Sequence, residues 1–424
     1  MLKSIFKTGL SKVLSLLIAL IIGIVISRVY GTEGKGLITL LILIPTMISL
    51  YAGFSLGEGF LYFIGNSKVS KNNFDKLLIK ITVLFSILLI ITFFASYYLL
   101  VNYEYYIFPQ ILLMISLFLG NILKFSLKAV LNFKRFNLIQ ILDPIIILIG
   151  LIIILILKTD LKLLLWGYLL SNIIQNIILY YSVKNKLITS TTDTKVNQIF
   201  KYSYKVHFFG IMNFTEAKFD VLLIGYIINI SAVGIYSVAI SITLIFQTVI
   251  QTSISTVLYP MLVKSLPDKR IKITKEYFKI SSTLSIFFLI TIILFGKYII
   301  TILYGDAFAE AYIPMLILII GAIAKSPTAC INSYFKAIGK PSELYKTSIV
   351  SLSTNIILCI ITIPTMGIIG AAISSSVSYF LYGIIMLNKF KRDTKTTYIE
   401  MIVLNKKDIR NLVLLVKKIN PRNG

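Results

Sequence analysis

Runs of about 20 apolar residues recur along this chain from one end to the other, and each is long enough to cross roughly 30 Å of hydrocarbon as a helix. Of the 424 residues, 57% are hydrophobic and 14% are charged, and the mean hydropathy is +0.89. The sequence therefore predicts an all-α integral membrane protein. The first run, 9–30, is too long for a signal-peptide core, so we interpret it as an uncleaved span.

The apolar runs predict twelve membrane-spanning helices joined mostly by short connections. The longest connection, 184–204, contains the polar stretch NKLITSTTDTKVNQ and divides the helices into two groups of six. The predicted spans are 9–30, 37–64, 77–100, 106–131, 138–157, 161–183, 205–229, 233–260, 277–303, 310–335, 343–364 and 367–388.

The basic residues are divided unequally between the two sides of this topology. With the N-terminus in the cytoplasm, 35 of the 42 Lys and Arg residues fall in cytoplasmic segments and 5 in outer segments. This is the bias of the positive-inside rule, and one missed or extra span would scramble it. Both termini and the 184–204 connection are therefore predicted to be cytoplasmic. The net charge of +25 reports topology and does not indicate nucleic-acid binding.

The two groups of helices resemble each other. YGTEGKGLITLL (30–41) follows the first span and NISAVGIYSVAI (229–240) follows the seventh, with Gly34 and Gly234 in register. Further weak matches follow in the same order. Because six is even, both copies would enter the membrane in the same direction, as in parallel-repeat transporters. We therefore expect two pseudo-symmetric six-helix lobes with a substrate path between them.

The lobes are expected at 1–190 and 191–390, followed by a basic cytoplasmic tail at 391–424. In the tail, NKKDIRNLVLLVKKI is amphipathic and too short to span. Asn405 and Asp408 are placed to cap a helix, which predicts an interfacial helix on an anionic leaflet. The alternative is a disordered basic tail.

Several segments resemble the polysaccharide flippases of the MOP superfamily. SRVYGTEGKG (27–36) is similar to the turn after that family's first helix, and KFDVLLIGYIINISAVGIYSVA (218–239) to its seventh helix and the turn that follows. LYGDAFAEAYIPMLIL (303–318) and NSYFKAIGKPSELYKTSIVSLSTNIILC (332–359) resemble its ninth to eleventh helices. The resemblance covers nearly the whole chain.

This resemblance implies a V-shaped, two-lobed fold of twelve helices. It also implies a flippase that carries undecaprenyl-pyrophosphate-linked oligosaccharide, such as an O-antigen or capsule repeat unit, across the bacterial inner membrane. Related lipid II flippases usually have two additional helices, which this sequence lacks. The expected partners are the lipid-linked glycan, membrane lipids and other glycan-assembly proteins, and we expect a monomer.

The stretch NFTEAKFDVLLIG (213–225) places charges at the predicted bilayer centre, where each costs roughly 2.5–3.5 kcal/mol on insertion scales. Asn213, Glu216 and Asp220 would form one polar stripe, with Lys218 on the opposite face of the helix. In the tenth span Lys325 is also near mid-depth, and Pro327 should break the helix there.

Two interpretations of these charges remain open. Lysines and acids either pair to stabilise the second lobe or line a water-filled cavity, since intramembrane ionisable residues are functional candidates by default. In the second interpretation the cationic residues bind pyrophosphate or acidic glycan, and the carboxylates couple transport to a proton or sodium gradient. The substrate-binding candidates are Arg28, Lys218, Lys325, Lys124 and Lys128, and the ion-coupling candidates are Glu58, Glu216 and Asp220.

Alternative explanations apply to some of these residues. Arg28 is also placed to cap a turn or anchor the outer edge, and Lys124 and Lys128 suit positive-inside anchoring. Glu58 lies near the cytoplasmic end of its span between flexible glycines, in GFSLGEGF.

No sequence feature indicates an enzyme. The single histidine, His207, lies near a predicted membrane surface, Cys330 and Cys359 have no disulfide or zinc spacing, and no phosphate-binding Gly-Lys-Ser/Thr loop occurs. We expect no cofactor or metal beyond the coupling ion. Rival functions are a drug or cation antiporter of the same superfamily, a lipid II-type flippase, a membrane enzyme of the glycan pathway, and a scaffold or lipid scramblase.

Overall fold

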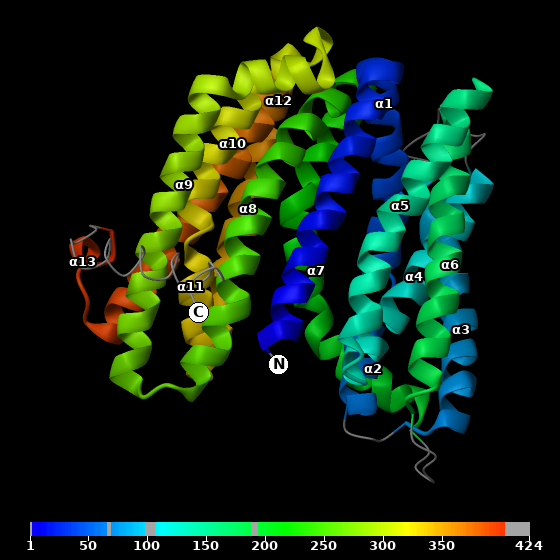
Figure 1. Ribbon diagram of the computed structural model, residues 1–424, viewed down its shortest axis with the longest axis horizontal. Coiled ribbons are helices and arrows are strands. Elements are labelled where there is room, and N and C mark those ends of the chain that lie inside the picture. Colours follow the sequence, from blue (N-terminus) through cyan, green and yellow to red (C-terminus); the bar gives the residue numbers. More distant parts are fainter. Residues whose placement is uncertain (1, 66–68, 98–106, 188–193, 403–424) are drawn as a thin grey trace, which may run out of the picture. The chain divides into compact units, whose positions relative to one another are not determined.

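The computed structural model describes residues 2–65, 69–97, 107–187 and 194–402, and every regular element in these ranges is a helix (Figure 1). The helices are α1 (Leu2–Tyr51), α2 (Leu56–Gly65), α3 (Lys71–Tyr97), α4 (Ile107–Ala129), α5 (Phe133–Leu157), α6 (Leu164–Lys184), α7 (Val196–Ile227), α8 (Ile230–Lys264), α9 (Pro267–Tyr304), α10 (Tyr312–Lys325), α11 (Thr328–Ala337), α12 (Ser342–Thr394) and α13 (Tyr398–Ile402), with short 3-10 helices η2 (Leu161–Leu163) and η3 (Asp306–Ala311). The interfacial helix predicted around 405–418 lies outside the described residues.

Two of the helices each contain two of the predicted spans. At about 1.5 Å per residue, the 50 residues of α1 and the 53 of α12 are far longer than the roughly 30 Å of a hydrocarbon core. Each is kinked where a glycine has positive φ, at Gly31 (64°) and Gly367 (60°), a region that glycine enters without steric cost. These kinks fall between the first and second and between the eleventh and twelfth predicted spans.

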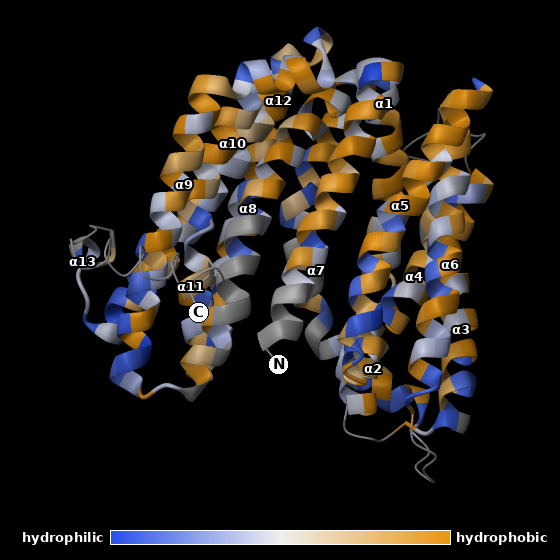
Figure 2. Ribbon diagram, viewed as in Figure 1, coloured by the Kyte–Doolittle hydropathy of each residue, from blue (hydrophilic) through white to orange (hydrophobic). Residues whose placement is uncertain are grey.

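In the described part of the chain, seven helices are long and apolar enough to cross a membrane, and α1 and α12 are among them. Hydrophobic residues cover most of the length of these helices, whereas hydrophilic residues gather at places such as the beginning of α9 (Figure 2). The protein is therefore a multi-pass helical membrane protein, as predicted.

Two predicted spans are interrupted. The span 37–64 is divided between α1 and α2, and 310–335 is divided between α10 and α11. The second interruption follows Lys325 and contains Pro327, so the predicted break at this proline is confirmed. The first interruption, at residues 52–55, is not predicted by the sequence analysis and lies next to the site described below.

The chain forms two compact units. Unit one comprises 3–238 with 303–307, and unit two comprises 239–302 with 308–424. In unit one α4 packs against α2, α3, α5 and α6, and in unit two α12 packs along α10 and α11. The predicted lobe boundary near residue 190 stays a prediction.

A reciprocal backbone contact joins the turn after the kink of α1 to the beginning of α8, within unit one. A Cβ atom at Gly36 would lie 1.9 Å from the carbonyl oxygen of Ile230, and one at Gly234 would lie 1.9 Å from that of Thr32. The spacing is four residues on both sides. Only glycine permits so close an approach at these two positions.

Candidate functional site

The α1–α2 break contains two consecutive residues in a strained backbone conformation. Between Tyr51 and Leu56, both Phe54 (φ 47°) and Ser55 (φ 49°) have positive φ without being glycine. Such residues cost about 1–3 kcal/mol each and persist only where their surroundings hold them. Here the ring of Phe54 lies 5.0 Å from that of His207 on α7, and the Ser55 hydroxyl is 3.2 Å from its Nδ1.

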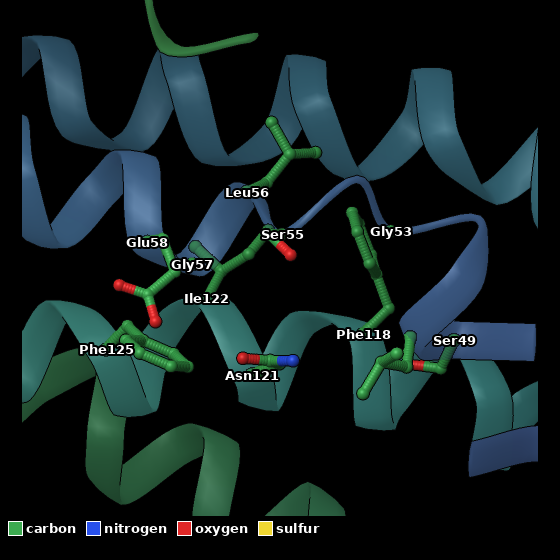
Figure 3. A pocket seen from close by; sticks show the side chains of 11 residues that line it. Ser49, Gly53, Ser55, Leu56, Gly57, Glu58, Phe118, Asn121, Ile122 and Phe125 are labelled. Atoms are coloured by element: carbon green, nitrogen blue, oxygen red, sulfur yellow. The ribbon is translucent and has the colours of Figure 1, made fainter. Parts of the chain in front are cut away.

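A pocket of about 130 Å³ lies beside this break, between the end of α1, the beginning of α2 and α4 (Figure 3). Broken helices at membrane depth are tolerated where they line a cavity, and their ends form ion and substrate sites in transporters. The lining residues are Ser49, Leu50, Gly53, Ser55, Leu56, Gly57, Glu58, Phe118, Asn121, Ile122 and Phe125. We refer to it as the polar pocket, because carboxylate, amide and hydroxyl groups line it.

Glu58 and Lys128 supply opposite charges at this pocket. Glu58 is half-buried in the first turn of α2, and Lys128 is the basic residue that acts on it electrostatically. The ammonium group of Lys128 lies 4.4 Å from the centre of the Phe125 ring, which also lines the pocket. This arrangement places a lysine on an aromatic face and within electrostatic range of a carboxylate.

A second cluster in unit one involves Asp143, which the sequence analysis does not identify. Its Oδ1 accepts a hydrogen bond from the Ser171 hydroxyl at 2.7 Å and another from the Gln175 amide. Asp143 also acts electrostatically on Lys124, one turn before Lys128 on α4. The available sequence signal is an isolated carboxylate before a proline, in QILDPIIILIG.

The charged stretch of α7 divides between two environments. Glu216 and Asp220 are buried, 4% and 3% exposed, while Lys218 is half-buried. Asp220 accepts a hydrogen bond from the hydroxyl of Tyr236 at 2.6 Å. The shared buried face of Glu216 and Asp220 agrees with the predicted stripe, whereas the side chain of Asn213 lies outside the described residues.

Arg28 lies apart from the polar pocket. Its Nε donates a hydrogen bond of 3.1 Å to the carbonyl oxygen of Leu303 at the end of α9. This contact matches the turn-capping alternative of the sequence analysis. Satisfying the last carbonyls of a helix with an arginine is also favourable for the helix dipole.

Lys325 belongs to unit two, at the end of α10. Its ammonium group lies 4.3 Å from the centre of the Tyr379 ring and 5.4 Å from that of Tyr382, both on α12. Aromatic faces stabilise a cation without neutralising it. The packing of α10 on α12 therefore fixes the position of the Lys325 ammonium group beside two aromatic rings.

Of the predicted site residues, the structure thus places Glu58 in the lining of the polar pocket and Lys128 within electrostatic range of it. Lys124 lies one turn away on α4, where Asp143 acts on it, and the α7 charges form a separate cluster of unit one. In the described ranges no group of His, Cys, Asp and Glu is arranged to hold a metal ion.

This fold is that of MOP-superfamily transporters. The lipid II flippase MurJ in an inward closed conformation is similar over 100% of this chain and 94% of its own, with a TM-score of 0.69 and 16% identity. A MATE transporter mutant from Vibrio cholerae, VcmN, is similar over 94% of this chain and 98% of its own, with a TM-score of 0.63 and 13% identity. The predicted fold class is confirmed.

The chain belongs to the polysaccharide biosynthesis protein family, which matches residues 25–313. The probable flippase AglR of Haloferax volcanii is 24% identical over 54% of this chain and 49% of its own length. The capsular polysaccharide biosynthesis protein CapF of Staphylococcus aureus is 24% identical over 48% and 51%. The chain thus matches about half the length of these curated relatives.

Proposed function

We propose that the protein flips undecaprenyl-pyrophosphate-linked oligosaccharide, an O-antigen or capsule repeat unit, across the bacterial inner membrane by alternating access. The observation that carries the proposal is membership of the polysaccharide biosynthesis family by a chain with the MOP transporter fold. A relative named as a flippase supports a transporter rather than a membrane enzyme of the glycan pathway.

The cargo is an anion, so cationic side chains are proposed to bind it. Pyrophosphate oxygens accept strong charge-assisted hydrogen bonds from lysine and arginine. Lys218 and Lys325 would act at mid-depth, and Lys124 and Lys128 near the end of α4. Arg28 stays a proposed cargo contact, although its Nε already has a backbone acceptor.

Ion coupling is proposed for the carboxylates. Glu58 is the strongest candidate, because it sits at a broken helix beside a pocket and interacts electrostatically with Lys128. A proton or sodium ion bound at Glu58 would change the field at that lysine, which links ion binding to anion binding. Asp220 and Glu216 are further candidates, because both carboxyl groups are buried on α7 and Asp220 accepts a hydrogen bond from Tyr236.

A second candidate function is antiport of drugs or other cations. Its support is the likeness to MATE transporters, one of them described as a multidrug resistance transporter. The lysines at 218 and 325 oppose it, because a cationic substrate would be repelled from them.

Proteoliposomes containing the purified full chain would test the proposal. A fluorescent undecaprenyl-pyrophosphate oligosaccharide should become accessible to a membrane-impermeant glycosidase only when the protein is present. A fluorescent cationic drug should not accumulate under the same proton or sodium gradient. Drug uptake without glycan flipping would favour the antiporter. Neither activity, with correctly folded protein, would favour the non-transporting scaffold. Light scattering of the detergent-solubilised protein would test the expected monomer.

A further inference from the structure

A second pocket, of about 340 Å³, lies on unit one between α3, the beginning of α7 and the α1–α2 break. Six of its seven lining residues are apolar, so we call it the apolar pocket. They are Phe54, Leu84, Phe85, Leu88, Val196, Asn197 and Phe200. The volume lies within the range of small-molecule binding sites, about 300–1,000 Å³.

Three aromatic rings hold the shape of this pocket. Phe54 lies 5.9 Å from Phe85 and 5.4 Å from Phe200, and Phe85 lies 6.2 Å from Phe200, measured between ring centres. Leu84 is 57% exposed and Phe200 is 36% exposed. The pocket therefore has an aromatic floor and opens at the surface of unit one.

Two lysines lie one helical turn from lining residues of the apolar pocket. Lys80 lies one turn before Leu84 on α3, and Lys201 lies one turn after Asn197 on α7, and both are exposed. Residues four apart share a helix face, so each lysine is on the same face as a lining residue. The nearby acid of α3, Asp75, already pairs with Lys184 at 2.6 Å. These positions put positive charge on the same helix faces as the lining residues, which defines a cationic rim for the proposed site, and the predicted topology places it on the cytoplasmic side.

The apolar pocket shares a wall with the polar pocket. Gly53 and Ser55 line the polar pocket, and Phe54, the residue between them, lines the apolar pocket. A ligand that displaces Phe54 would therefore act on the strained segment formed by Phe54 and Ser55. This segment ends three residues before Glu58. Occupancy of one pocket can change the other through this single turn.

We propose that the apolar pocket binds the isoprenoid chain of a polyprenyl pyrophosphate, with Lys80 and Lys201 at its phosphates. The inference rests on the proposed function and identifies where the carrier lipid first contacts the protein. A pocket with an aromatic floor and a cationic rim fits an amphiphile whose apolar tail is joined to a multiply charged anion. A zwitterionic or singly charged phospholipid matches the rim less well.

Photolabelling of the full chain in nanodiscs would test this site without requiring transport. The probe is a polyprenyl pyrophosphate with a diazirine on its terminal isoprene unit and no glycan. Mass spectrometry should locate adducts within 84–88 and 196–200, and unlabelled undecaprenyl pyrophosphate should abolish them. Leu88→Trp should fill the pocket and lower labelling about tenfold. Ile87→Trp is the matched control, because Ile87 is 59% exposed on α3 and does not line the pocket. It should leave the labelling unchanged.

The rim is tested by Lys80→Gln combined with Lys201→Gln. Labelling by the pyrophosphate should fall about tenfold, while labelling by the same chain as an uncharged alcohol should not change. Equal labelling of the two tryptophan variants, or equal competition by phosphatidylglycerol, would overturn the proposal. If Leu88→Trp does not fold, Leu84→Trp replaces it at a more exposed position of the same pocket. Specific labelling without glycan flipping would instead overturn the proposed function alone.

Discussion

The α1–α2 break and the α10–α11 break interrupt membrane helices in different ways. At the first, Phe54 and Ser55 both have positive φ, and two pockets lie against the segment. At the second, Ser326 (φ −62°) and Pro327 (φ −64°) keep helical dihedrals, and the Ser326 amide still bonds to Ala322. A proline thus interrupts a helix by removing a donor, whereas the first break stores backbone strain. Stored strain of this kind concentrates at functional sites, which favours the first break as the ion-coupling element.

The comparison of the two breaks depends first on the orientation of the chain in the membrane. The predicted orientation is either correct or wrong, so this test has the largest effect. At about 1.5 Å per residue, the α1–α2 break lies about 30 Å along the helix from Gly31, and the α10–α11 break lies about 20 Å along α10 from its beginning. In the predicted orientation both helices start on the outer side, so these lengths are depths measured from that side. Reporter fusions at Asn185 and Gly424 should both be active only as cytoplasmic reporters. Periplasmic activity from either fusion would reverse these depths and exclude the twelve-helix topology.

Neutralising the acid of the first break should have the largest effect on transport. Glu58→Gln should lower glycan flipping about tenfold or more and flatten its dependence on pH or sodium, because it removes the proposed ion-binding group. The exposed Glu310→Gln is the control and should leave transport intact. Transport by Glu58→Gln with an unchanged ion dependence would show that the first break is not the coupling element.

The lysine next to the second break should affect cargo binding more than ion dependence. Lys325→Met keeps an unbranched side chain at this position and removes the charge that lies over the Tyr379 ring, so binding of the lipid-linked glycan should weaken about tenfold while the pH profile keeps its shape. Microscale thermophoresis with fluorescent glycan would measure this. A fall in thermal stability with unchanged affinity would instead assign Lys325 to the packing of α10 on α12.

The smallest expected effect comes from replacing serine by glycine at each break in turn, in two separate variants. Ser326→Gly should destabilise the protein by about 0.5 kcal/mol, because glycine is less favourable than serine in a helical segment by roughly this amount. Ser55→Gly relieves a positive φ but loses the hydroxyl contact with His207, so the two terms of about 1 kcal/mol each should nearly cancel. Thermal unfolding in detergent would compare them, and equal losses at both sites would contradict the difference in strain.

The sequence predicted most of the membrane fold because span length and hydropathy depend on the solvent rather than on detailed packing. The break at Pro327 was predictable for a local reason, since proline lacks an amide hydrogen. The break at Phe54 and Ser55 was not, because its conformation is imposed by contacts with His207, which is about 150 residues away along the chain. Only the glycines around Glu58 hinted at it.

Some residues of the candidate site could be predicted from the sequence, but their spatial association could not. Glu58 and Lys128 are charges in apolar runs, which can be recognised without a structure. The proximity of Glu58 and Lys128 depends on the packing of α2 on α4, and the electrostatic interaction of Lys124 with Asp143 depends on the packing of α4 on α5. The aromatic setting of Lys325 requires α12, which lies about 55 residues further along the chain.

The glycine contact between Gly36 and Ile230, and between Gly234 and Thr32, has a consequence for the origin of the chain. Each side offers a glycine and the residue four positions before it, an offset of 198 between the two sides that lies two residues from the offset of 200 between Gly34 and Gly234. Two identical subunits related by a two-fold axis make contacts of this self-complementary form. A six-helix ancestor able to pair with its own copy would already have possessed this junction, and joining the two copies would have made it permanent within one polypeptide.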